Sequence, residues 1–338
     1  MFRRTRHEWI ASRRRAAPYH RRLRLEPLED RQLLSITVNT LVDENDGIGT
    51  GGISLRDAIA AASPGETINF AVTGTITLGH GELVIDKDLS IVGPGADLLA
   101  IDANGSSRVF NVDNSNAVIA TVSISGLTIS GGYIDGDGGG IANAENLTVA
   151  SSTLSGNTTT HSGGAVFTHQ GNLTIRDSTL SGNAAQYGGG LYNVSGLDFV
   201  TTITNSTVSG NTATDGGGGI YNFVGHVVIQ HATITNNTAD HGRGGGLVSW
   251  GDTNITLPEV FSSIIAGNHA NEEVLPGTDV DVVGGDIGGP DDTIESGGYN
   301  IVDTGNATGI FNQDGDAIIS ILDLLLGPLA DKIGRAHV

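Results

Sequence analysis

A single pattern of apolar and polar positions recurs through residues 125–268. Each copy opens with a Ser-Thr-apolar-Ser-Gly-Asn run or a variant of it, continues through a glycine cluster that precedes one apolar residue, and closes with an alternating apolar run. The last asparagine of the opening run recurs after 26, 28, 26 and 31 residues. Such a period indicates stacked units that cannot bury their apolar faces alone. The asparagines are Asn157, Asn183, Asn211, Asn237 and Asn268.

Each copy contains three short apolar runs separated by Gly, Asn, Ser and Asp. The runs are too short for helices, and their β-branched residues are typical of strands. We therefore expect three strands in every coil, or complete circuit of the chain, of a parallel β-helix, with equivalent side chains stacked about 4.8 Å apart. The expected inward columns are Leu154, Leu180, Val208, Ile234 and Ile265; Ile141, Val166, Leu191, Ile220 and Leu247; and Val149, Ile175, Ile203, Ile229 and Leu257.

The recurring asparagine follows glycine in most copies, which places it at a corner between strands. There its side chain tolerates left-handed backbone and can bond neighbouring main chain, and stacked asparagines can bond coil to coil. The alternative is a series of glycosylation acceptors, because several other asparagines precede x-Ser or x-Thr. These acceptors would be Asn146, Asn172, Asn205, Asn236 and Asn254.

One segment before the repeats has the pattern of a helix. Residues 54–62 carry apolar residues at helical spacing, with Ser54 as the expected N-cap and Asp57 at the capping-box position. Pro64 and Gly65 end the segment. A short amphipathic helix ahead of a solenoid is expected to close its open end. Short apolar runs between residues 66 and 124 predict the first, less regular coils.

The pattern divides the chain into a basic segment, one long domain and a short tail. Residues 1–35 are expected to lie outside the fold, and residues 36–331 to form a single β-helix domain. Residues 332–338 resemble the translation of a sequencing adaptor, so we interpret them as an artefact and expect the true C-terminus to be missing. The parts of the domain are the N-terminal cap at 36–65, the coils at 66–275, and irregular terminal coils with a loop at 276–331.

The composition is strongly acidic and limits the partners. The chain has 17 Lys and Arg against 37 Asp and Glu, a net charge of −20, and ten of the 17 lie in residues 1–31. The remainder therefore lacks the basic footprint that nucleic acid or an anionic membrane surface needs. There is no cysteine, which excludes disulfides. No apolar run is long enough for a membrane span.

Two acidic stretches are candidates for Ca²⁺. Residues 43–47 combine three acids with a glycine, and alternate oxygen ligands suit this ion, although a full EF-hand loop is absent. Ordinary turn chemistry is the alternative in both stretches. We assign no cofactor and keep Ca²⁺ as an alternative. The second stretch contains Asp279, Asp281, Asp286, Asp291 and Asp292.

Three motifs resemble segments of exported bacterial proteins. Residues 25–35 resemble the Leu-Glu-Pro-Arg-x-Leu-Leu-Ser segment near the N-terminus of large exported proteins. Residues 53–59 resemble the Cys-Ser-Leu-Arg-Glu-Ala domain of surface β-helix proteins, although Ile53 replaces its cysteine. The coils resemble right-handed β-helix proteins, including polymorphic outer-membrane repeats with their Gly-Gly-[Ala/Gly]-Ile pattern. These resemblances imply an all-β, right-handed parallel β-helix solenoid with a short N-terminal capping α-helix, outside the cell or on its surface.

Signals for catalysis are weak. A glycoside hydrolase needs two carboxylates about 5–9.5 Å apart, and Asp215 and Asp240 are the best pair because each precedes a glycine cluster at a similar offset. Both sit at expected turns, where Asp is ordinary. A lyase needs a basic residue beside an acid cluster, and residues 125–258 contain only Arg176 and Arg243. We therefore assign no catalytic, cofactor-binding or metal-binding residue. The dispersed histidines are His161, His169, His226, His231 and His241.

Aromatic residues offer a more promising surface. Phe167, Tyr192 and Tyr221 follow equivalent inward residues, so strand alternation points them outward on three successive coils, with Phe223 and Trp250 nearby. Stacked aromatics can simply stabilise neighbouring strands. The functional alternative is a platform for sugar rings or a protein partner.

We predict a non-enzymatic exported or cell-surface protein, adhesin-like and monomeric, that binds a glycan or a surface protein. Nucleic acid and a membrane span are not expected. The alternative is a carbohydrate-active enzyme, either a polysaccharide lyase or a glycoside hydrolase, on the same scaffold. A purely structural spacer within a longer chain is a third interpretation.

Overall fold

The computed structural model describes residues 35–116, 118–241, 244–249 and 258–270, together with isolated positions between 287 and 319. All of them belong to one unit, Leu34–Val338. The predicted export segment, most of the second acidic stretch and the C-terminal tail lie outside the described residues. The predicted domain boundaries therefore stay predictions. Also outside are Arg243, Trp250, Asn254 and Leu257.

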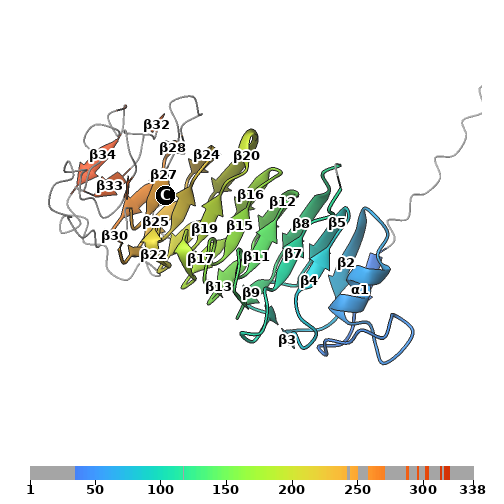
Figure 1. Cartoon of the computed structure of the whole chain (residues 1–338). Helices are drawn as coiled ribbons and strands as arrows, with labels where there is room; N and C mark the ends of the chain where they lie inside the picture. Colours follow the sequence, from blue (N-terminus) through green and yellow to red (C-terminus); the bar gives the residue numbers. More distant parts are fainter. Residues whose placement is uncertain are drawn as a thin grey trace, which may run out of the picture. The chain divides into compact units, whose positions relative to one another are not determined.

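The described chain is a parallel β-solenoid, as predicted, in which strands of successive coils stack along four sheets (Figure 1). We name the sheets A to D. Sheet A contains β1 (Ser35–Val38), β2 (Glu66–Phe70), β5 (Leu89–Val92), β8 (Thr121–Ser125), β12 (Asn146–Ala150), β16 (Leu173–Arg176), β20 (Gly196–Thr204), β24 (Gly225–Gln230), β28 (Glu259–Phe261) and β32 (Glu295–Ser296). Sheet B contains β3 (Gly74–Thr77), β6 (Leu99–Asp102), β9 (Thr128–Ser130), β13 (Thr153–Ser155), β17 (Thr179–Ser181), β21 (Thr207–Ser209), β25 (Thr233–Thr235), β29 (Ile264–Ala266), β33 (Ile301–Asp303) and β34 (Ala317–Ile319).

The other two sheets complete each coil. Sheet C contains β4 (Leu83–Ile85), β7 (Phe110–Val112), β11 (Ile141–Asn143), β15 (Val166–Thr168), β19 (Leu191–Asn193), β23 (Ile220–Asn222), β27 (Leu247–Ser249) and β31 (Ile287–Gly288). Sheet D contains β10 (Tyr133–Ile134), β14 (Thr158–Thr159), β18 (Ala184–Tyr187), β22 (Thr212–Gly216), β26 (Thr238–Ala239) and β30 (His269–Ala270).

Sheet D was not expected, because the sequence predicted three strands per coil. Its strands are mostly two residues long, which is too short for alternation to be visible in the sequence. Their inward residues are also small. Those residues are Thr159, Ala185, Ala213 and Ala239, all buried.

The apolar columns run in register through the core, as predicted. Leu154 pairs with Leu180, and Leu180 with Val208, while Ile141 pairs with Val166. All these side chains are fully buried, and the alternating residues beside them are partly exposed in most coils. At roughly 1.5–3 kcal/mol for each buried aliphatic side chain, these columns are the main stabilising contribution.

The third column departs from its prediction at one coil. Ile229 pairs with Val260 of β28, not with Leu257. The preceding members of this column, Val149, Ile175 and Ile203, each lie three residues before a corner serine, and Val260 keeps that distance from Ser263. Apolar and polar residues alternate in residues 255–257 as well, and for this reason the strand was predicted there. Alternation alone therefore predicted the wrong segment as the strand.

The corner asparagines form a buried ladder, as the sequence indicated. In Asn183 the backbone amide and Nδ2 both donate to Asn211 Oδ1, at 3.0 and 2.8 Å, and Nδ2 also donates to Leu154 O at 3.0 Å. Asn157, Asn211 and Asn237 make equivalent bonds to the next coil. The left-handed residue, however, is the one before the asparagine, with φ near 63° at Gly156, Gly182 and Gly210 and 55° at Asn236.

Helix α1 (Leu55–Ala61) lies at the N-terminal end of the described coils, in blue in Figure 1. Ser54 is its N-cap and accepts from the Asp57 amide, as predicted. Leu55, Ala58 and Ile59 are buried against the first coils, so the helix covers the open end of the apolar core.

Candidate functional site

The outward face of sheet C carries the predicted column of aromatic rings. Phe167 on β15 pairs with Tyr192 on β19, which pairs with Tyr221 on β23. Ring centroids are 5.7 Å apart for the first pair and 5.3 Å for the second, with planes inclined by 14° and 15°. These values describe offset stacking, which stabilises aromatic pairs beyond their area burial.

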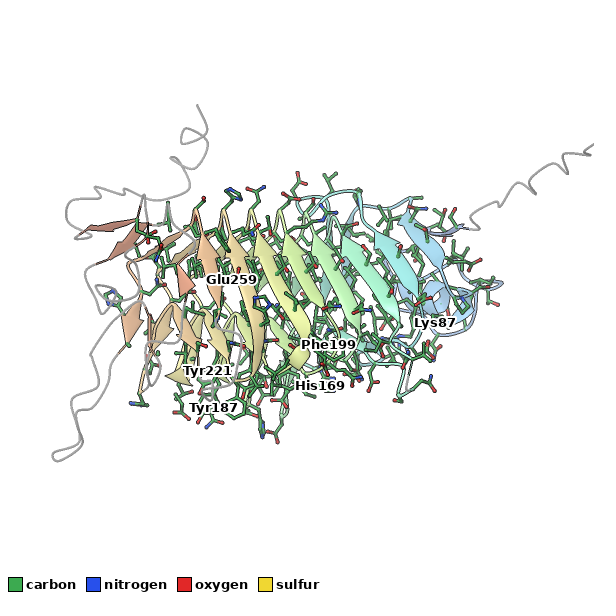
Figure 2. The ribbon with its side chains drawn as sticks, turned by 90° about the horizontal axis from the view of Figure 1, so that it is seen from above. Lys87, His169, Tyr187, Phe199, Tyr221 and Glu259 are labelled. Atoms are coloured by element: carbon green, nitrogen blue, oxygen red, sulfur yellow. The ribbon has the colours of Figure 1, made fainter. Side chains whose placement is uncertain are left out.

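Three further rings enlarge the column into a cluster. Phe223 stacks on Tyr192 at 6.5 Å and is 39% exposed, whereas Tyr187 packs edge-on against Tyr221 at 5.3 Å. His169 lies 5.6 Å from Phe167. Figure 2 shows Tyr187, Tyr221 and His169 on the same side of the coils. We call the six side chains Phe167, His169, Tyr187, Tyr192, Tyr221 and Phe223 the aromatic cluster.

The cluster differs from the flat platform that the sequence suggested. Tyr221 is only 8% exposed, because Tyr187 from the neighbouring sheet D packs against it. The accessible ring surface therefore comes from the partly exposed Phe167, Tyr187 and Tyr192 and from the exposed Phe223. The position of Tyr187 was not predicted, because its strand was not predicted.

Two tyrosines of the cluster, Tyr187 and Tyr192, have raised pKa values. Burial raises the pKa of Tyr192 to about 12, and the charge of Asp137 and the neighbouring Tyr187 add to the shift. Burial also raises the pKa of Tyr187, together with the charge of Asp215 and a hydrogen bond to it. Both phenols therefore remain neutral hydrogen-bonding groups at neutral pH.

The two carboxylates considered for catalysis do not lie side by side. Ala239 pairs with Ala213, so Asp240 lies beside Thr214, and its amide donates to Ala213 O at 2.8 Å. The carboxylate of Asp215 is directed to the preceding coil, where it accepts from Gln186 Nε2 at 2.6 Å. The similar offset in sequence did not give equal positions, because Asp215 lies two residues after Ala213 whereas Asp240 directly follows Ala239.

The described histidines do not form a catalytic arrangement. His226 Nε2 lies 3.2 Å from Glu259 Oε1 on sheet A. In the exposed group Asp135, Thr160 and His161, the hydroxyl lies between the acid and the imidazole, at 2.5 and 3.0 Å. A nucleophile is activated when the imidazole lies between the hydroxyl and the acid, so this order does not suit acyl transfer.

Three carboxylates near α1 could hold a cation. Oxygen atoms of Glu44, Asp46 and Asp57 all lie within 4.8 Å of one another. Asp43, which the sequence placed in the same stretch, is instead bonded to Arg56, at 2.8 Å from Oδ1 to Nε. Carboxylate oxygens are the ligands that Ca²⁺ prefers. Ca²⁺ binding stays a prediction, and these three acids are its candidate ligands among the described residues.

One family model matches the chain. It is the Chlamydia polymorphic membrane protein repeat, and it matches residues 205–222, which run from the end of β20 to β23. The repeat suggests a surface or outer-membrane location for a protein on a β-solenoid scaffold. No curated protein and no solved structure matches the chain. Within the described residues, the structure contains no helix of the length and apolarity that a membrane span requires.

Proposed function

We propose that the chain is an exported, non-enzymatic surface protein that binds a glycan or protein partner in the manner of an adhesin. The polymorphic membrane protein repeat at residues 205–222 supports the surface location. The observation that supports binding is the aromatic cluster, in which rings recur at one position on three successive coils, and the rings of Phe167 and Tyr192 remain partly exposed. Rigid amphipathic rings of this kind are enriched in binding interfaces.

A repeating partner suits this surface better than a compact ligand. The rings of Phe167, Tyr192 and Tyr221 follow the solenoid axis at one ring per coil. Tyrosine hydroxyls at their edges add hydrogen-bonding groups beside the apolar faces. A polysaccharide offers the same combination of apolar ring faces and hydroxyls in a regular repeat. Each contact is weak, and several adjacent contacts raise the overall affinity.

Catalysis is the less favoured function. The register directs Asp215 toward Gln186 and Tyr187, away from Asp240. Arg176, the only described Lys or Arg in residues 125–258, lies on sheet A and pairs with Asp177 at 3.0 Å. These positions do not support Asp215 and Asp240 as a hydrolase pair, nor Arg176 as the base of a lyase.

A glycan array followed by titration of the bound glycans tests this proposal. Tyr192→Ala and Phe223→Ala are expected to lower the affinity at least about fivefold, as for residues in the centre of an interface. Tyr133→Ala is the matched control, because this tyrosine is 45% exposed on β10 and lies outside the cluster. Circular dichroism and urea unfolding of each variant separate lost binding from lost structure.

The competing enzymatic function is tested by assays for reaction products. A reducing-sugar assay and an absorbance assay for unsaturated products are run on every glycan that binds. Product that disappears in Asp215→Asn or Asp240→Asn would replace our proposal by an enzymatic one. Absence of binding to any glycan or surface-protein extract would support the structural spacer instead.

A further inference from the structure

Carboxylates flank the aromatic cluster where sheet D meets sheet C. Asp215 bonds Gln186 and also Tyr187, whose ring packs against Tyr221. Asp137 accepts from the Ser162 amide at 3.0 Å, and its charge acts on Tyr192. Both carboxylates are only partly buried. Their field therefore extends into the solvent in front of the rings.

Neither of these two carboxylates has a described Lys or Arg as its ion-pair partner. Arg108 contacts Asp137 only at its carbonyl oxygen, at 2.7 Å from Nη2, and its charge is paired with Glu82 at 2.6 Å. Arg243 lies outside the described residues. The described Lys and Arg side chains all have a carboxylate partner, in the pairs Arg56–Asp43, Lys87–Asp86, Arg108–Glu82 and Arg176–Asp177.

We infer that the aromatic cluster binds a glycan whose sugar rings carry protonated amines, that is, a polymer of amino sugars. This inference rests on the proposed function and specifies in addition that the ligand is positively charged. The rings receive the apolar faces of the sugars, while Asp137 and Asp215 accept hydrogen bonds from the ammonium groups. A neutral glycan makes only the first contact, and an acidic glycan is repelled by both carboxylates.

The positions of the carboxylates favour a polymer over a single amine. Asp137 precedes β11 and Asp215 precedes β23, so their backbones lie three coils apart, about 14 Å along the axis. Their carboxylates bond residues of the two coils between them, Ser162 and Gln186. A chain with an amine on each ring contacts both acids while it crosses the stacked rings between them.

The rings themselves favour a glycan over a basic peptide. A lysine side chain loses much rotamer freedom when it is held against a surface, whereas a sugar ring is already rigid. The column also ends at Phe167, since the equivalent position on the preceding coil holds only Ala142. A flat sugar ring can extend the stack over this methyl group.

Calorimetric titration with two matched oligosaccharides tests the inference. The glucosamine hexamer and the N-acetylglucosamine hexamer share one backbone and differ at the amine, which is charged in the first and acetylated, hence neutral, in the second. At low ionic strength, and at a pH that keeps the amines protonated, we expect the glucosamine hexamer to bind at least about tenfold more tightly. This difference shrinks as salt is added, because salt screens partly exposed charges.

Substitutions that remove the charge of one carboxylate test which residues cause the preference for the glucosamine hexamer. Asp137→Asn and Asp215→Asn keep an acceptor oxygen for Ser162 and Gln186, and each is expected to lower glucosamine affinity about three- to tenfold. Neither changes affinity for the N-acetylated hexamer. Asp97→Asn is the matched control, since Asp97 is exposed in the loop before β6 and its loss alters only the net charge.

Four outcomes would contradict the inference. Equal affinity for the two hexamers overturns it and leaves the proposed glycan binding in place. If Asp97→Asn lowers the affinity for glucosamine as much as Asp137→Asn and Asp215→Asn do, the net charge of the protein alone accounts for the preference. A lysine hexamer that binds as tightly as glucosamine moves the ligand from glycan to peptide. Failure of every glycan on the array to bind overturns the proposed glycan binding as well.

Discussion

The N-terminal coils, residues 35–125, and the repeat coils, residues 126–270, are joined to their neighbours by different groups. In the repeat coils, uncharged side chains at the same position of successive coils, from Asn157 to Asn268, bond one another inside the core. In the N-terminal coils, charged side chains bond carboxylates and backbone carbonyls at the end and edges of the solenoid. The difference follows the sequence, because only the repeat coils present the same residue at the same place.

The repeat coils carry two buried polar ladders. The asparagines bond side chain to side chain and side chain to backbone at every step from Asn157 to Asn268. Corner serines form the second ladder, in which the amide of one coil donates to the hydroxyl of the next, for example Ser152 to Ser178 at 3.1 Å. The stacked groups bond one another, which offsets much of the desolvation cost of their burial.

The N-terminal coils replace the ladders by a charged clamp. Arg56 bonds both carboxylate oxygens of Asp43, the carbonyl of Gly81 and the carbonyl of Glu82, at distances between 2.6 and 3.0 Å. Burial, the largest single effect, would raise the pKa of Asp43. Hydrogen bonds from Arg56 and from the Gly79 and His80 amides together outweigh it and hold the pKa below its usual range.

The largest effect is expected from breaking the asparagine ladder at its centre. Asn211→Ala removes the acceptor of the Asn183 amide and of its Nδ2, and it removes two bonds donated to Leu180 and Asn237. The buried groups left without partners lower the free energy of unfolding by about 3–5 kcal/mol. Urea unfolding followed by circular dichroism measures the change.

A neighbouring substitution provides the control for Asn211→Ala. Thr212→Ala changes an exposed residue of the same coil, and its amide still donates to Asn183 O at 2.9 Å. We expect a change below about 1 kcal/mol. Equal effects of the two substitutions would show that the ladder contributes no more than general strand preference.

Breaking the N-terminal clamp is expected to have a smaller and more local effect. Arg56→Gln leaves Asp43, whose side chain is 3% exposed, without its cation, and this costs about 2–4 kcal/mol. Hydrogen exchange should quicken at the amides of β1, β2 and β3 before it changes in the repeat coils. Uniform acceleration through all coils would contradict a local role.

Arg176→Gln is the matched control for the clamp. Its pair with Asp177 is roughly half exposed on both sides. Exposed pairs contribute little, so we expect a change below about 0.5 kcal/mol and unaltered exchange in the N-terminal coils.

Much of this organisation follows from the period of the sequence. Leu154, Leu180 and Val208 align because a fixed repeat carries each inward residue onto the next. The same reasoning predicted bonding between stacked asparagines, and the cap of α1 followed from Ser54 and Asp57. Prediction from the period was least reliable where a coil is longer than the others. One such coil contains an inserted segment, so its inward residue is Val260 and not the residue expected from the period.

Contacts across corners were beyond the reach of the sequence. Tyr187 covers Tyr221 because a short strand of sheet D turns it toward sheet C. Arg56 reaches Asp43 across a loop of non-repeating residues. A period fixes the displacement from one coil to the next, but it does not fix where a side chain points at a corner. The aromatic column was therefore predictable, whereas its covering residue was not.

The smallest expected effect concerns a gap in the serine ladder. Ser178 donates its amide to Ser206 Oγ at 3.2 Å, and Ala232 donates to Ser263 Oγ at 3.1 Å, but Ala232 offers no hydroxyl to Ser206. The residue before each corner has the same left-handed backbone, with φ of 47° at Asn205 and 51° at His231. The backbone at Ala232 therefore matches that of the serine corners.

Filling this gap should stabilise the repeat coils. Ala232→Ser places a hydroxyl where it can accept from the Ser206 amide and donate to the carbonyl two residues earlier, as Ser206 and Ser263 do at 2.8 and 2.7 Å. A gain of about 0.5–1.5 kcal/mol in the free energy of unfolding is expected. Ser206→Ala should produce a loss of similar size. If both substitutions destabilise the protein, the existing serines are adapted to their own coils, and repetition alone does not account for the ladder.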